Sequence, residues 1–150
     1  EAPAMTQLAS QRNASISTQR YVRASFDMPA QTLLMTPTAQ SVGSLWNGIL
    51  GQLRAWRELA NVDGKIDGDA ANRAIRYAQL LLRDGESIPT RVGTTNSGGV
   101  AFEWRHDDIL VHVEIIDGLR AEYTEFRGKE LTEDADLVWS EDAQAFCSVH

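Results

Sequence analysis

The sequence predicts an α+β domain in which two helices are followed by, and packed on, an antiparallel β-meander of about four or five strands. Three observations predict this class. Apolar residues recur at helical spacing between residues 41 and 84, they alternate with polar residues from Val100 onward, and short polar turns separate the alternating segments. Short strands joined by tight turns form an antiparallel sheet, and we expect the helices to cover its apolar face.

Residues 1–40 differ in composition from the rest of the chain. They are rich in Ser, Thr, Gln and Ala and contain three of the four prolines. We expect this segment to form an N-terminal arm that is flexible or becomes ordered against a partner or its own sheet. Tyr21 and Phe26 are candidate partner-binding residues in the arm, and residues 41–150 then form the single α+β domain.

The first predicted helix covers residues 41–60. Its apolar stripe recurs every three or four residues and consists of Leu45, Ile49, Leu53, Trp56 and Leu59. Trp46 widens this stripe. Two tryptophans on one short helix indicate either a large buried face or an exposed binding face, so Trp46 and Trp56 are candidate partner-binding residues.

The second predicted helix covers residues 69–84. Asp67 or Asp69 provides an N-terminal cap. Gly85 stands where a left-handed C-terminal cap is expected, and Pro89 prevents the helix from continuing.

Beyond Pro89 the period changes from helical to alternating. A short strand is expected around Val92, and further strands over residues 100–104, 109–116 and 119–124. Asp117-Gly118 predicts a two-residue hairpin turn. Leu137–Trp139 is expected to form an edge strand, and residues 143–149 a terminal helix or strand.

Composition narrows the functional classes. Hydrophobic residues make up 43% and charged residues 23% of the chain, as in ordinary globular proteins. The net charge of −7 disfavours nucleic acids and anionic membranes as partners. The sequence has no apolar run long enough to span a membrane. The single cysteine, Cys147, fits a reducing compartment. We therefore expect a cytoplasmic protein. No cofactor motif is present.

The run from Ser97 to Trp104 resembles a loose group of uncharacterised small bacterial proteins. Their pattern is a helix, a proline turn and a Gly-Gly-x-x-x-Glu-Trp hairpin, and the likeness covers roughly residues 45–125. Members often carry Trp-Asp-Gly before the second helix, where this chain has Val62-Asp63-Gly64. The resemblance implies a fold and assigns no catalytic residue.

Two clusters of polar residues are candidate sites for metal binding or catalysis. The loop between the helices partly matches a calcium-binding loop, with Asn61, Asp63 and Asp67 as candidate ligands. The first and last ligand positions are Leu59 and Ala70, which cannot supply side-chain oxygens, so a helix-capping turn is the favoured interpretation.

The second cluster contains Glu103, His112 and Glu114 near one hairpin. Such a set can hold a metal or act as acid and base, although the polar face of any antiparallel sheet looks similar.

The leading functional hypothesis is a non-enzymatic protein-interaction or accessory subunit, such as an inhibitor, antitoxin, immunity or chaperone-like protein. It binds a protein partner or a second copy of itself. Small size, acidic charge and the lack of any catalytic motif favour it. The alternatives are a small enzyme or metal-binding protein using the Glu103, His112 and Glu114 face, and a weak calcium-binding helix-loop-helix module.

Overall fold

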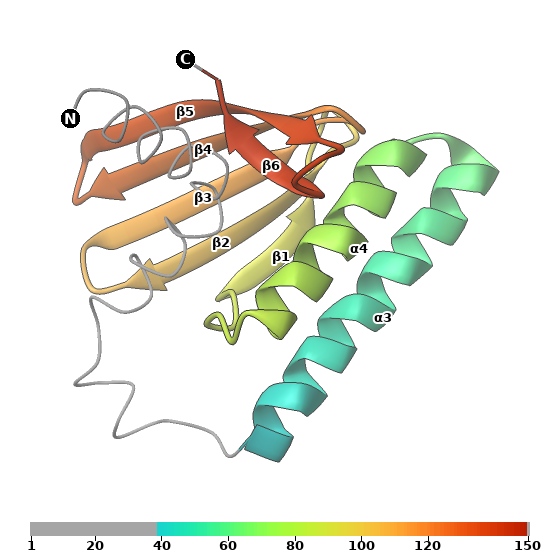
Figure 1. Cartoon of the computed structure of the whole chain (residues 1–150), viewed down its shortest axis with the longest axis horizontal. Helices are drawn as coiled ribbons and strands as arrows, with labels where there is room; N and C mark the ends of the chain where they lie inside the picture. Colours follow the sequence, from blue (N-terminus) through green and yellow to red (C-terminus); the bar gives the residue numbers. More distant parts are fainter. Residues whose placement is uncertain (1–38, 150) are drawn as a thin grey trace.

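The computed structural model describes residues 39–149. In this part of the chain, two helices precede six strands (Figure 1). The helices are α3 (Ala39–Asp63) and α4 (Gly68–Arg83). The strands are β1 (Arg91–Thr94), β2 (Val100–His106), β3 (Ile109–Ile115), β4 (Arg120–Arg127), β5 (Glu130–Ser140) and β6 (Ala145–Ser148). The predicted α+β class is therefore confirmed, with six strands instead of four or five. Tyr21 and Phe26, together with nearly all of the predicted arm, lie outside the described residues.

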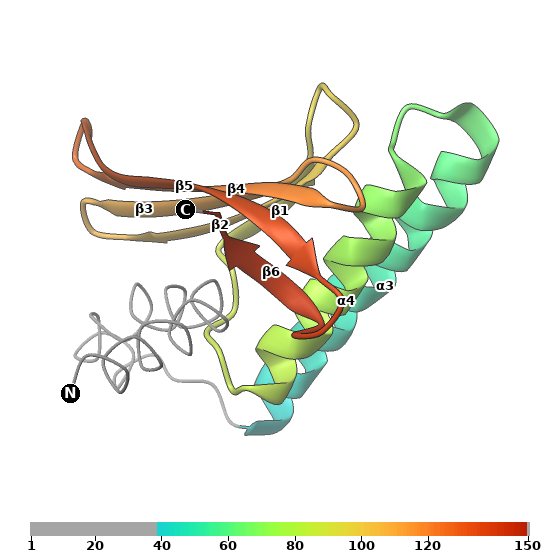
Figure 2. The same cartoon turned by 45° about the horizontal axis from the view of Figure 1, so that its top comes forward.

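The helices form two layers on one side of the sheet. Helix α3 packs on α4, and α4 packs on β2 and β3 (Figures 1 and 2). Buried alanines allow α4 to approach both neighbours closely; they are Ala70, Ala71, Ala74 and Ala78. Helix α3 begins two residues before the predicted start and continues to Asp63. No helix among the described residues is long and apolar enough to cross a membrane.

Helix α4 begins as the sequence predicts. The Asp67 carboxylate oxygen Oδ1 accepts hydrogen bonds from the backbone N–H groups of Asp69 and Ala70, at 2.9 Å each. This satisfies donors that a helix start otherwise leaves unpaired. Gly85 adopts a positive φ of 72° just after the helix, as expected of a residue that reverses the chain there.

The sheet is a simple meander. Its six strands are ordered β1-β2-β3-β4-β5-β6, and every neighbouring pair is antiparallel. The predicted edge strand at Leu137–Trp139 is wrong in detail. Those residues belong to β5, which pairs with β4 on one side and β6 on the other, so β6 forms the edge.

The apolar face of the sheet and the helices share one core. Its largest fully buried side chains include Trp46, Leu53 and Leu81 from the helices and Phe102, Tyr123 and Phe146 from the sheet. Tyr77 of α4 meets the Phe102 ring edge-on, with 5.1 Å between centroids. Such contacts between aromatic rings add to the stabilisation from burial.

The predicted two-residue turn at Asp117-Gly118 is also wrong. Strands β3 and β4 are joined by residues 116–119, and Asp117 Oδ1 accepts the N–H groups of Leu119 and Arg120. Gly118 serves close packing instead, because a Cβ there would lie 3.0 Å from Asp69 Cβ on α4. Arg73 of α4 donates a 2.8 Å hydrogen bond to the Gly118 carbonyl, which ties the helix to this loop.

Candidate functional site

One face of the sheet is left open by both described helices. In Figure 2, α3 and α4 lie on one side of the sheet, and the opposite side is open. Side chains alternate between the two faces along a strand. On β4, Ala121 and Tyr123 point to the helix side and are buried, whereas Arg120 and Glu122 point the other way and are exposed. We call this second side the outer face.

Carboxylates gather in the middle of the outer face. Glu114 on β3 lies opposite Glu122 on β4, which lies opposite Asp136 on β5. Cβ atoms at directly opposite positions are about 4.5–5.5 Å apart, so three acidic side chains stand next to one another across three strands. The adjacent row adds Glu103 on β2 and Asp134 on β5. We call these five residues the acidic rows.

Most carboxylates of the acidic rows have no ion-pair partner among the described residues, Glu103 beside His112 being the exception. None of the ion pairs between described residues includes Glu114, Glu122 or Asp136. Glu114 accepts a hydrogen bond from the Ser97 hydroxyl at 3.2 Å, which leaves its negative charge in place. Like charges at directly opposite positions destabilise a sheet. We therefore expect the contacts between Glu114, Glu122 and Asp136 to destabilise the fold.

The structure brings two of the three predicted hairpin residues together. His112 Nδ1 lies 3.3 Å from Glu103 Oε1, and both side chains are partly buried, with 29% and 26% exposed. Glu114 is on the same face but bonds to Ser97. A histidine beside a carboxylate can exchange a proton, but catalysis also needs a substrate position next to it. The pair faces the open sheet surface and is not part of the pocket described below.

The three predicted calcium ligands have other roles or none. Asn61 is an exposed residue of α3, Asp63 accepts the N–H of Lys65 at 3.0 Å, and Asp67 caps α4. Among residues 39–149, no group of three or more histidine, cysteine or acidic side chains is arranged to hold a metal ion. The observed geometry is that of a capping turn between two helices.

Replacing Asp67 with alanine tests this geometry. The change removes the acceptor for two N–H groups, so we expect a loss of about 1 kcal/mol in the free energy of unfolding. The loss is expected to be the same with and without calcium, as measured by urea unfolding. Asn61→Ala is the matched control and is expected to leave stability nearly unchanged. Calcium-dependent stabilisation of the wild type that disappears in Asp63→Ala would restore the calcium interpretation.

The two helix tryptophans are held by their own chain. Trp46 is fully buried in the core, and Trp56 is half-buried and packs against the same cluster. The burial of Trp46 matches the first of the two alternatives predicted for this helix, a large buried face. Its indole is therefore not accessible to a partner in the folded chain.

Cys147 also does not have the surroundings of a reactive thiol. Burial raises the pKa of Cys147 above its ordinary value, which lowers the fraction of thiolate at neutral pH. Cys147 lies on β6 opposite Val138 of β5. It is a packed residue at the edge of the outer face.

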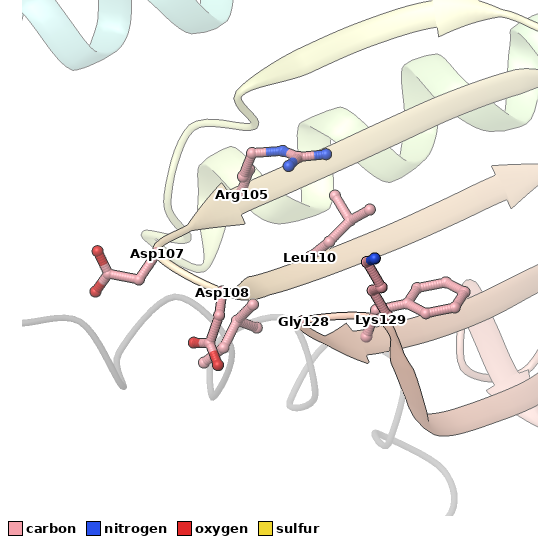
Figure 3. Close-up of a pocket in the computed structure, with 8 residues that line it drawn as sticks. Arg105, Asp107, Asp108, Leu110, Gly128 and Lys129 are labelled. Carbon is pink, nitrogen blue, oxygen red and sulfur yellow. The ribbon is translucent and has the colours of Figure 1, made fainter.

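A pocket of about 400 Å³ opens at one end of the sheet (Figure 3). It lies between the tight β2–β3 turn at Asp107-Asp108 and the tight β4–β5 turn at Gly128-Lys129. The two turns are joined by a 2.7 Å hydrogen bond from the Gly128 N–H to the Asp108 carbonyl. The sequence does not predict this pocket, because two turns that are distant in the sequence form it together.

These features define a small α+β domain. Its outer face is left open by the described helices, carries the acidic rows and has a pocket at one end. Comparison of the chain with protein-family models, with curated proteins and with solved structures found no match. The resemblance to the loose bacterial group therefore stays a prediction.

Proposed function

We propose that this protein is a non-enzymatic interaction subunit whose outer face binds a basic protein partner. The observation that carries the proposal is the register of the acidic rows, which places Glu114, Glu122 and Asp136 at directly opposite positions on three adjacent strands. A partner that brings lysine or arginine side chains to these carboxylates relieves their mutual repulsion and gains favourable charge interactions.

Exposed apolar side chains on the same face support a protein partner. Leu131 and Val138 of β5 are 49% and 42% exposed, and they flank the acidic rows on either side along the strand. An interface usually combines apolar contact area with charge complementarity. A phosphate-bearing nucleic acid fits this face poorly, because the carboxylates repel it.

The charge pattern favours a different protein over a second copy of this chain. A two-fold symmetric dimer places the same patch on both subunits. Pairing the outer face with itself would bring carboxylates of one copy close to carboxylates of the other. The proposed partner therefore carries a basic surface that this chain does not offer here.

The capture experiment compares two variants with the same change in charge. The face variant is Glu114→Gln, Glu122→Gln and Asp136→Asn. The control variant is Glu58→Gln, Glu130→Gln and Asp142→Asn, which changes exposed carboxylates outside the acidic rows. We expect the wild type and the control to retain the same protein from a lysate of the source cells, and the face variant to lose it. Equal retention by both variants would contradict the proposal.

Stability provides an independent measurement on the same variants. Removing the repulsion across two strand pairs is expected to raise the free energy of unfolding of the face variant by about 1 kcal/mol. The control variant is expected to stay within about 0.5 kcal/mol of the wild type. A face variant that is more stable and yet loses the partner indicates that these carboxylates serve binding instead of folding. Ordinary solubilising charge would produce no loss of binding.

A further inference from the structure

The pocket at the end of the outer face has an apolar floor. Leu110 of β3 lies opposite Phe126 of β4, and both side chains line the pocket and are half-buried. Leu131 of β5 lies opposite Phe126 and extends this apolar row across a third strand. Apolar surface of this kind gains free energy when a ligand covers it.

Two cationic side chains line the pocket next to these apolar residues. Arg105 of β2 lies opposite Leu110, and Lys129 comes from the β4–β5 turn. Figure 3 shows the Leu110 side chain between the Arg105 guanidinium and the Lys129 amine. The carboxylates of Asp107 and Asp108 also line the pocket, and both point away from the two cations. The part of the pocket around Leu110 therefore has a cation on each side of an apolar centre, while the two carboxylates balance the charge of the pocket as a whole.

Neither cation forms an ion pair with another described residue. The ion pairs between described residues involve five other arginines and two histidines, and none includes Arg105 or Lys129. In a chain with a net charge of −7, two unpaired cations that share one pocket are available to an external anion. Arginine in particular binds carboxylates with two parallel hydrogen bonds.

We propose that this pocket binds the C-terminal residue of the protein partner. An apolar terminal side chain covers Leu110 and Phe126, while the terminal carboxylate is held between Arg105 and Lys129. The C-terminus fits because it is the one place in a polypeptide where a carboxylate and an apolar side chain share a single Cα. This inference rests on the proposed function, since it assigns an anchor to the same docking face.

The spacing of the face gives the partner terminus a sequence pattern. Successive rows on one face of a sheet are two residues apart, about 7 Å along the strand. Glu103 and Asp134 occupy the row next to the pocket row, and the row of Glu114 follows. A bound terminus whose chain runs along the outer face therefore meets carboxylates with the residues just before its end. Lysine or arginine is expected at those positions.

The experiment uses the full chain, labelled with ¹⁵N, and two synthetic peptides. Both have the sequence acetyl-Lys-Ala-Lys-Ala-Leu; one ends in a free carboxylate and the other in a carboxamide. We expect the free-acid peptide to shift the amide resonances of Leu110, Phe126 and Gly128 in NMR titration. The carboxamide is expected to bind about tenfold more weakly, because it lacks the charge that the two cations hold.

Variants separate the pocket from the acidic rows. Arg105→Gln or Lys129→Gln is expected to lower the affinity for the free-acid peptide by about tenfold and to leave the affinity for the carboxamide peptide unchanged. Arg54→Gln, an exposed cation on α3, is the matched control and is expected to have no effect. The face variant is expected to bind both peptides more weakly, because it removes carboxylates that would pair with the lysines of the peptides. The Arg105 and Lys129 variants change surface side chains, so they are expected to fold.

Three results would overturn the pocket proposal. Equal affinity for the acid and the carboxamide, with both weakened in the face variant, would refute it and leave the docking face intact. Acetyl-leucine binding as tightly as the peptide would indicate a site for a small carboxylate instead of a partner terminus. No shift of the pocket resonances at millimolar peptide would also refute the pocket, while the capture experiment continues to test the docking face separately.

Discussion

Gly99→Ala is expected to destabilise the fold by about 3 kcal/mol, because the new methyl group has no space. A Cβ on Gly99 would lie 2.5 Å from the Ile115 carbonyl oxygen and 3.1 Å from Thr95 Oγ1. Ile115 pairs with Val100 in the sheet, so its carbonyl cannot move without disturbing the strand pairing. The Thr95 hydroxyl also accepts the Gly99 N–H at 3.0 Å, and the methyl group would strain this turn. Urea unfolding followed by tryptophan fluorescence measures the loss.

Gly48→Ala is the matched control and has the opposite expected sign. Gly48 is an exposed residue of α3, and nothing lies within 4 Å of a Cβ placed there. Alanine lowers the entropy of the unfolded chain and favours the helix, so a gain of about 0.5–1 kcal/mol is expected. If Gly99→Ala were as stable as the wild type, the close approach of the β1–β2 turn to β3 would be wrong.

The fold class could be predicted because the spacing of apolar residues within each segment indicates whether that segment is a helix or a strand. Helix α4 combines an apolar stripe, an aspartate cap and a terminal glycine, and its observed bounds lie within one residue of the predicted 69–84. After Pro89, apolar and polar residues alternate, and this pattern correctly predicted that the chain forms strands there. Local patterns of this kind depend on a few neighbouring residues, and tertiary packing here reinforces them.

Strand register was less predictable, because two local signals disagree. A two-residue turn at Asp117-Gly118 would place Glu114 opposite Ala121. In the structure, Glu114 lies opposite Glu122, and Ile115 lies opposite Ala121. Pairing the apolar residues on the buried face outweighs the turn signal, since a slip of one residue would move every side chain of β4 to the other face.

The acidic rows depend on this register, and for that reason the sequence indicated only Glu103 and Glu114 of their five residues. Alternation assigns Glu114 and Glu122 to the polar side of their strands, but only the pairing shows that they are neighbours. The pocket depends on register even more, because Arg105, Leu110 and Phe126 come from three strands and share one row. A run of carboxylates on successive predicted strands is the signal that points toward such a face.

Buried Glu86 is expected to make stability depend on pH in a direction opposite to that of most carboxylates. Its side chain is only 5% exposed, and its Oε2 atom has no hydrogen-bond partner among the described residues. Burial, assisted by the nearby charge of Asp84, raises the pKa of Glu86 from an ordinary 4.5 to about 7. The residue follows α4, and its N–H bonds to the Leu81 carbonyl at 2.9 Å, which fixes the backbone there.

The sign of the effect follows from the protons that each state binds. Between pH 4.5 and 7, the folded state keeps a proton on Glu86 that the unfolded state has released. The folded state therefore binds more protons, and its stability falls as the pH rises through this window. The shift in pKa corresponds to a loss of about 3 kcal/mol once the pH is well above 7.

Glu86→Gln is expected to remove this loss, because the amide has nearly the same shape and cannot ionise. The variant should match the wild type below pH 4.5 and exceed its free energy of unfolding by about 3 kcal/mol well above pH 7. Other groups titrate in the same range, so the measured quantity is the difference between variant and wild type at each pH. Glu130→Gln, an exposed carboxylate, is the control and should give no such difference. A Glu86→Gln curve parallel to that of the wild type would mean that water reaches this carboxylate, since only a dry site keeps it protonated near neutral pH.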